Sequence, residues 1–262
     1  MHIVVLVKPV PDPAAAAERL GPDGRLERSA SPTVVNANDE YALEAALKLV
    51  AEHGGDVTLL SMAAGSAPET MRKALAMGAD RGIHVSDPAL AGSDTLSTAR
   101  VLAAALRDVE ADLILAGVDT SDGGGGVVAP GIAALLGVPY LSYAAKIEPA
   151  PGAGTVRVRR ISPTGYDLLE APMPALIGCT QALGEPRYPS LKGIMAARSK
   201  EIATRALADV GLADGSVGGD VATSKVVGST KPPARAATRV VRGTPDEAAD
   251  EVVAFLAERR II

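Results

Sequence analysis

The sequence predicts an α/β fold, with an open, mostly parallel, Rossmann-like sheet and helices on both faces. Two observations carry this prediction. Short apolar segments alternate with helical patterns up to about residue 140, and such alternation is typical of a parallel sheet covered by helices. Hydrophobic residues make up 47% of the 262 residues, whereas aromatic residues make up only 2%. A core of Ala, Val, Leu and Ile suits helices packed on a buried parallel sheet.

Each strand predicted in this part is a short apolar run, and each helix shows apolar residues at helical spacing. The predicted strands are 3–7, 57–60, 82–85 and 113–116. The predicted helices begin at Asn38 or Asp39, near Pro68, at Asp94 and after a glycine-rich loop. We expect the second helix to end at Gly78 and the fourth at Gly137. The residues of the third helix expected to face the core are Leu96, Val101, Leu102 and Leu106.

The remainder of the chain predicts three further strands and a final helix. Residues 155–161 and 167–170 indicate a strand pair, and residues 175–180 indicate a strand that returns to the main sheet. Gly, Ser, Ala, Pro and Val dominate from Gly211 to Thr238, which indicates an extended arm. Residues 245–262 predict a short amphipathic helix. We therefore expect an α/β domain over residues 1–205 and, over residues 206–262, a C-terminal arm and helix that pack on a partner chain.

Charge and cysteine content narrow the classes of function. The net charge of −5 and the scarcity of aromatic residues argue against a nucleic-acid partner. Cys179 is the single cysteine, so no disulfide forms within the chain, and its apolar neighbours predict a buried structural thiol in a protein of the reducing cytoplasm. We expect no signal peptide and no membrane insertion, because no basic leader begins the sequence and no apolar run approaches the roughly 20 residues of a membrane span.

The loop from Gly117 to Val128 follows a predicted strand and precedes a predicted helix. Its four glycines, Gly123–Gly126, allow close approach of the backbone to a ligand, and the helix N-terminus favours an anion such as phosphate. Asp119 and Asp122 would repel a phosphate unless they cap backbone N–H groups or hold a ribose hydroxyl. A plain flexible loop is the alternative, since neither the Walker motif nor the dinucleotide fingerprint is present.

Three other segments, 6–8, 36–39 and 61–65, end at the same edge of the predicted sheet. Their main-chain groups can hold an adenine ring with Met62 packed on its face, although ordinary core packing of Met62 is the alternative. The three histidines lack metal-ligand spacing, and no serine lies in a nucleophile elbow. The sequence therefore predicts a ligand bound for structural reasons, or chemistry supplied by another subunit.

The segment from Glu185 to Met195 places Leu191 among polar and small neighbours. Pro186 and Pro189 fix their own φ angles and disfavour a helix at the residues before them, so we expect a stiff surface loop. Such a loop with an exposed leucine can dock into a partner's pocket at low entropic cost. The alternative is an ordinary turn whose leucine folds back onto the core.

Five segments together resemble electron transfer flavoprotein beta subunits, most of all those of high-GC bacteria. They are Val4–Lys8, Asn36–Ala45, Glu69–Asp80, Pro172–Ile177 and Glu185–Met195. The resemblance implies an adenine-nucleotide-binding, HUP-like fold and an electron carrier subunit without catalytic residues of its own. It also implies a heterodimer with an alpha subunit that holds most of the FAD, while AMP in the beta subunit stabilises the assembly. Such complexes carry electrons from dehydrogenases, such as acyl-CoA dehydrogenases, to a membrane quinone oxidoreductase.

By position, the resemblance also implies site residues. Those expected to contact AMP are Leu6, Asn36, Ala37, Asn38, Asp39, Met62, Gly117, Asp119, Asp122, Gly123, Gly124, Gly125, Gly126, Val127 and Val128. Those expected to contact the dehydrogenase are Tyr188, Pro189, Leu191, Ile194 and Met195, with Leu191 as the anchor. The sequence departs from the family where Gly124, Val127 and Ala129 replace polar residues of the nucleotide loop, and the basic tail after the docking segment is thinner.

Three rival functions use the same kind of fold. A bifurcating flavoprotein subunit would hold its own FAD where AMP is expected. An ATP-hydrolysing or adenylating enzyme needs a phosphate-binding loop after the first strand, which Pro9–Asp12 does not supply. A nucleotide-sensing regulatory module would bind ATP reversibly and form a homodimer.

Overall fold

The computed structural model describes residues 1–15, 20–28, 31–230, 233 and 240–262, and within them a nine-stranded sheet forms the centre of the fold. The strand order is β11-β5-β4-β1-β6-β10-β7-β8-β9. Neighbours are parallel from β11 to β7, whereas β7, β8 and β9 are antiparallel. The strands are β1 His2–Leu6, β4 Asp56–Met62, β5 Arg81–Val85, β6 Leu113–Gly117, β7 Tyr140–Ala150, β8 Thr155–Ser162, β9 Gly165–Pro172, β10 Ala175–Cys179 and β11 Ile202–Arg205.

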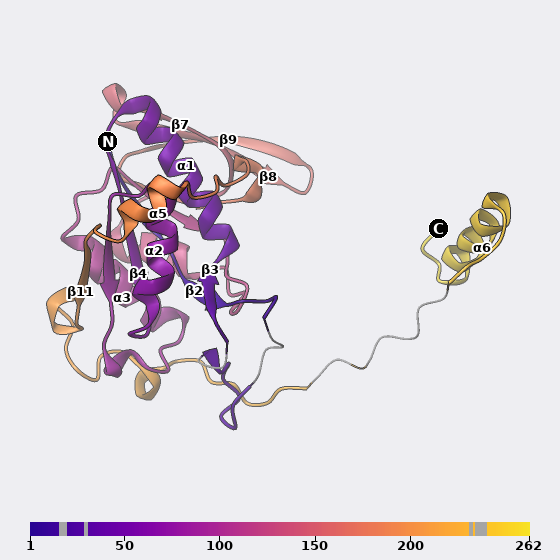
Figure 1. Ribbon diagram of the computed structural model, residues 1–262, viewed down its shortest axis with the longest axis horizontal. Helices are drawn as coiled ribbons and strands as arrows, with labels where there is room; N and C mark the ends of the chain where they lie inside the picture. Colours follow the sequence, from indigo (N-terminus) through magenta and orange to yellow (C-terminus); the bar gives the residue numbers. More distant parts are fainter. Residues whose placement is uncertain (16–19, 29–30, 231–232, 234–239) are drawn as a thin grey trace. The chain divides into compact units, whose positions relative to one another are not determined.

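Helices cover both faces of this sheet, so the predicted fold class is confirmed. On one face lie α1 (Ala37–His53), α2 (Ala67–Met77) and the short α5 (Leu191–Ala197), while α3 (Thr95–Arg107) and α4 (Val128–Leu136) lie on the other. Figure 1 shows α1, α2 and α5 together in front of the strands, with α3 behind them. Each face buries its own apolar cluster, which includes Leu43 and Leu75 on the α1 side and Val101 and Ile132 on the α3 side.

Several predicted elements are confirmed, and four strands were not predicted. The predicted strand pair is β8 and β9, and the predicted returning strand is β10, which lies between β6 and β7. The four strands that were not predicted are β7, β11 and the two strands of a small antiparallel sheet, β2 (Pro9–Pro11) and β3 (Thr33–Val35). Proline lacks a backbone donor, so a strand that begins and ends with proline resembles a loop in sequence.

Two local predictions about helices were wrong. The N-cap of α1 is Asn36, not Asn38 or Asp39, and its side chain makes no capping bond because its oxygen accepts the N–H of Ser121 instead. Leu96 does not face the core: it lies in the first turn of α3 and is 40% exposed. The predicted helix ends at Gly78 and Gly137 are confirmed.

Contacts within the described residues divide the chain into two compact units, Met1–Val227 and Gly228–Ile262. Residues 206–227 lie with the sheet, where Leu207 and Val210 are buried. The expected arm includes residues 231–232 and 234–238, which lie outside the described residues. The second unit contains the predicted C-terminal helix, α6 (Pro245–Glu258), which begins with a capping box at Thr244. The boundary predicted after residue 205, and the packing of the arm on a partner chain, stay predictions.

Asp94 ties a late segment of the first unit to the start of α3. One carboxylate oxygen accepts the N–H of Ser97 at 2.9 Å and so caps the helix. The other accepts the N–H and the hydroxyl of Thr223, at 2.7 and 2.8 Å. The Ser97 N–H and the Thr223 donors hold the pKa of Asp94 well below its usual range. A single carboxylate therefore joins the helix cap to residues that precede the second unit.

We expect Asp94→Ala to lower the free energy of unfolding by about 2 kcal/mol, because it removes a helix cap and the hydrogen bonds from Thr223 and Ser224. Limited proteolysis should also cut the chain after residue 222 faster than in the wild type. Urea unfolding and a time course of trypsin digestion measure the two effects. Asp108→Ala, at the exposed C-terminal end of the same helix, is the matched control. Equal proteolysis of the two variants would contradict the tethering role.

Candidate functional site

The carboxyl ends of β1, β4 and β6 lie side by side, because these strands are parallel neighbours. Gly117 ends β6 and faces the first turn of α1 so closely that a Cβ there would lie 2.7 Å from the Cβ of Asn38. This close approach brings the loop after β6 against the segment that begins α1. The predicted convergence of residues 6–8, 36–39 and 117–128 at one edge of the sheet is therefore confirmed. Residues 61–65, predicted at the same edge, end and follow β4, the parallel neighbour of β1.

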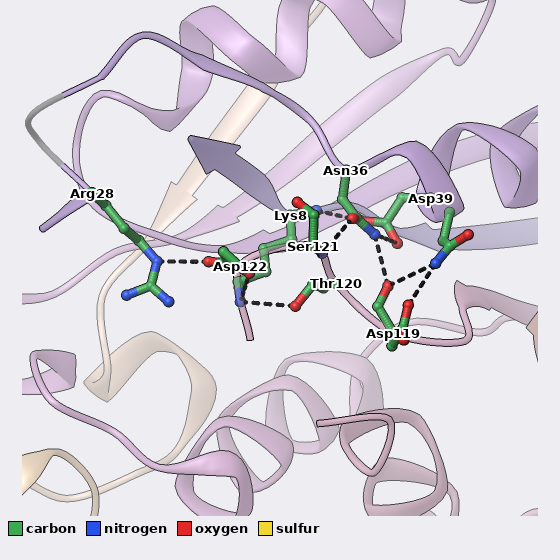
Figure 2. A network of polar contacts seen from close by, with 9 residues as sticks. Lys8, Arg28, Asn36, Asp39, Asp119, Thr120, Ser121 and Asp122 are labelled. Atoms are coloured by element: carbon green, nitrogen blue, oxygen red, sulfur yellow. Dashed lines mark hydrogen bonds and ion pairs between the residues drawn. The ribbon is translucent and has the colours of Figure 1, made fainter. Parts of the chain in front are cut away.

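Asp122 is the most strongly paired acidic group of the glycine-rich loop. Its side chain is only 1% exposed and lies 2.8 Å from Lys8 Nζ and 2.7 Å from Arg28 Nε. Burial alone would raise the pKa of Asp122, but the bonds and charges of Lys8 and Arg28 lower it overall. Figure 2 shows Lys8 and Arg28 converging on this carboxylate. The negative charge that would repel a phosphate is thus balanced by two cations, neither of which was predicted as a site residue.

A second group of polar contacts joins α1 to the same loop. Asn36 donates to the main-chain oxygen of Asp119 at 2.9 Å and accepts the N–H of Ser121 at 3.1 Å. Asn38 donates to the Asp119 carboxylate at 2.6 Å. Asp39 accepts from the Lys8 N–H and from Asn36, and it is buried. Figure 2 shows Asn36 between Asp39 and Asp119. These contacts fix where the loop leaves the sheet.

The four glycines beyond these contacts are exposed, and two of them need the left-handed backbone region. Gly124 has φ +54° and Gly126 has φ +63°, which side chains rarely adopt. Among the described residues, the N–H groups of Gly125, Gly126 and Val128 have no hydrogen-bond partner within the chain. The N-cap of α4, Val127, offers no side-chain cap either. The start of α4 therefore presents unpaired donors and the positive end of a helix dipole, which suits an anionic group.

The other residues predicted to contact AMP differ in their exposure to solvent. Leu6 is buried in the core, Met62 is half-buried against the same cluster, and Ala37 and Val127 are exposed. Lys8, Arg28 and Ser121 carry the contacts of the loop but were not predicted as site residues. Lys8 could have been found from the sequence, because it is a charged residue directly after an apolar strand. Arg28 could not, because it lies 94 positions from Asp122 in the sequence. Whether the predicted residues contact AMP stays a prediction.

An exposed apolar patch lies around the start of α5. Tyr188 is 95% exposed and Leu191 is 78% exposed, with Ile194 and Met195 exposed beside them. The stretch predicted as a stiff loop is therefore a loop followed by a short helix, because the Ser190 hydroxyl accepts the Gly193 N–H and starts a helical turn. Leu191 does not fold back onto the core, which removes the alternative interpretation of this segment.

Side chains that could ligate a metal ion are dispersed in the part of the chain that the structure describes. That part holds no group of three or more His, Cys, Asp or Glu side chains placed to bind a metal ion. Cys179 is fully buried in β10, and burial raises the pKa of its thiol, as expected of a structural cysteine. The described helices also include none with the length and apolar character of a membrane span.

Asp39 predicts a pH dependence of stability. Burial raises its pKa from 3.8 to about 7, against hydrogen bonds from Lys8, Asn36 and Gly117 that lower it. The folded chain then holds this proton more tightly than the unfolded chain, so the Asp39 contribution to stability falls as the pH rises from about 4 to about 7. Relative to Asp39→Asn, which does not titrate, the wild type should lose about 1 kcal/mol per pH unit between pH 5 and 7.

Urea unfolding of both proteins at several pH values measures this difference. The asparagine amide faces the donors of Lys8, Asn36 and Gly117, which lowers the stability of the variant, but that cost does not depend on pH and leaves the slope intact. A constant difference between wild type and variant over this range would contradict the prediction.

Comparison with known proteins gives one consistent family. The family model described as "Electron transfer flavoprotein domain" matches residues 23–210. The chain is 37% identical over 267 residues to "Electron transfer flavoprotein subunit beta" of Mycobacterium tuberculosis, covering 100% of this chain and 99% of that one. It is 34% identical over 263 residues to the protein of the same name from Clostridium acetobutylicum, covering 100% of both chains. "Protein FixA" of Azorhizobium caulinodans is 40% identical over 221 residues, covering 82% of this chain and 78% of that one.

Proposed function

This chain belongs to the electron transfer flavoprotein beta-subunit family, and on that premise we propose that it forms a heterodimer with an FAD-carrying alpha subunit. The complex accepts electrons from flavin dehydrogenases, such as acyl-CoA dehydrogenases, and delivers them to a quinone oxidoreductase. The chain contributes a docking surface for the dehydrogenase and a bound AMP that stabilises the assembly. It acts as an electron carrier subunit, while the redox chemistry is supplied by the FAD of its partner.

The exposed patch on α5 carries this proposal. An isolated leucine on a protein surface needs no explanation, but four large apolar side chains gathered on eight residues do. Tyr188 and Leu191 project from a segment that carries Pro186 and Pro189, so little conformational entropy is lost when a partner covers them. The patch therefore suits docking of a dehydrogenase, with Leu191 as the anchor.

The glycine-rich loop suits the phosphate of AMP. The unpaired N–H groups of Gly125, Gly126 and Val128 would bind its oxygens, and Lys8 and Arg28 offset the charge of Asp122 nearby. Met62, half-buried at the end of β4, offers an apolar surface for the adenine ring. The side chains of Asn36 and Asp39 are bonded within the chain, so their part is to hold the loop in place.

The nucleotide content of the assembled protein tests the proposal. The chain is co-expressed with an alpha subunit from the same genome, and the purified complex is denatured and its small molecules identified. We expect one AMP and one FAD per heterodimer. Two FAD molecules and no AMP would favour the bifurcating flavoprotein, and a homodimer that binds and hydrolyses ATP would refute the proposed function.

We expect Leu191→Ala to lower kcat/KM for electron transfer from a purified acyl-CoA dehydrogenase by about tenfold, because the variant lacks the apolar anchor. The alpha–beta complex should form in full yield, since the patch is expected to face the dehydrogenase. Leu20→Ala, at another leucine that is 52% exposed, is the control. The anchor role fails if both variants transfer electrons as fast as the wild type.

A further inference from the structure

Glu44 is a buried acidic residue that the proposed electron transfer does not explain. It lies in the middle of α1, and its side chain is only 6% exposed. Buried glutamates are rare unless they are paired, and removing the partner of a buried charge is costly. Lys48, one turn further along α1, lies 3.6 Å from Glu44 Oε1, and the closer partner is Arg187, the residue directly before the exposed Tyr188.

The contact between these two residues fixes both the side chain and the main chain of Arg187. Arg187 Nε lies 2.7 Å from Glu44 Oε2, and its terminal nitrogen lies 3.1 Å from Oε1. The main-chain N–H of Arg187 also donates to Oε2, at 3.1 Å. Burial alone would raise the pKa of Glu44, but the bonds and charges of Arg187 and Lys48 lower it overall, so the pair stays charged. A bidentate ion pair together with a main-chain hydrogen bond fixes the position of the backbone far better than a single surface ion pair does.

The far end of the segment is fixed as well, against α2. Gly193 lies so close to α2 that a Cβ at this position would overlap the main-chain oxygen of Ala76. Arg72, also on α2, donates to the main-chain oxygen of Ala197 at 2.6 Å. Residues 188–196 are therefore held at one end by α1 and at the other by α2, and the apolar patch lies between the two attachments.

We propose that Glu44 is a positioning residue that holds Arg187 and thereby presents the patch of Tyr188, Leu191, Ile194 and Met195 in its docking conformation. This inference rests on the proposed function, because it assigns a role in docking. A segment that is ordered before binding loses less entropy on binding, so Glu44 should act on affinity and not on the electron transfer that follows. Glu44 does not touch the dehydrogenase and acts only through the segment that Arg187 begins.

The test uses the full alpha–beta complex as electron acceptor for a purified acyl-CoA dehydrogenase. We expect Glu44→Gln to raise KM for the complex about tenfold with kcat unchanged, from lost pre-organisation of several residues. In a Leu191→Ala background the same substitution should raise KM less than twofold, since the anchor it positions is absent. Glu52→Gln, on the exposed side of α1, is the matched control and should leave both constants unchanged. Arg187→Lys keeps the positive charge but loses the bidentate contact with Glu44. It takes the place of Glu44→Gln if the Glu44→Gln protein does not fold.

Amide hydrogen exchange of residues 188–196 measures the positioning directly and does not require a dehydrogenase. Exchange should be at least about tenfold faster in Glu44→Gln, with the amides of β1 and β4 unchanged. Unchanged exchange, or an equal KM increase with and without Leu191, overturns the inference while leaving the proposed function intact. A wild-type complex that accepts no electrons from any flavin dehydrogenase overturns the proposed function instead, and the exchange experiment still decides the role of Glu44.

Discussion

Replacing Gly117 by alanine is expected to destabilise the chain by about 3 kcal/mol, toward the upper end of overpacking effects. The new Cβ would lie 2.7 Å from the Cβ of Asn38 and 2.8 Å from its carbonyl carbon. These atoms belong to the first turn of α1 and to its backbone, so a rotation of one side chain cannot relieve the overlap. Either α1 moves away from β6, or the end of β6 moves away from β10.

Urea unfolding of Gly117→Ala measures the effect. Gly65→Ala is the control, because a Cβ at Gly65 has no heavy atom within 4 Å. It should change the free energy of unfolding by less than about 0.5 kcal/mol. Equal stability of the two variants would show that the loop and α1 pack less closely than described.

Replacing Gly124 by valine is expected to lower the AMP content of the purified complex at least tenfold. Gly124 has φ +54°, a backbone conformation that costs a β-branched residue roughly 1–3 kcal/mol. The loop escapes that strain by changing conformation, which disperses the unpaired N–H groups that follow Gly124. Nucleotide released on denaturation, measured by chromatography against protein concentration, gives the occupancy.

A control variant with similar backbone strain elsewhere in the chain separates the loss of AMP from a general loss of stability. Gly54 ends α1 with φ +75°, and a Cβ there meets no atom within 4 Å. Gly54→Val therefore introduces similar backbone strain far from the glycine-rich loop. It should keep its AMP, and a complex with Gly124→Val that does the same would rule out the loop as the phosphate site.

The parallel half of the fold was predictable because its signals are local. The strands β1, β4, β5, β6 and β10 are apolar runs, and the intervening helices show apolar residues at helical spacing. The missed strands lack that signal. In β7 the alternation of buried and exposed side chains is broken at Tyr143, whose φ is +50°. The strand β11 has only four residues and lies at the edge of the sheet.

The site was predictable in its place but not in its contacts. Glycine composition and the position after a strand identified the loop, whereas its pairing depends on residues far apart in the sequence. Arg28 and Asp122 meet only because the fold brings them together, and no spacing rule connects them. The exposure of Leu191 was likewise undecided, since a docking anchor and a core leucine look the same in sequence.

The position of β10 has a consequence for synthesis of the chain. β10 lies between β6 and β7, although both of these strands precede it in sequence. One edge of β6 pairs with β1 and the other with β10, so this second edge has no native partner until residue 179 has left the ribosome. Until then the fully apolar run of β6 offers an open edge to other chains. A nascent chain of this protein is thus open to pairing with other chains at β6 until its last central strand is made.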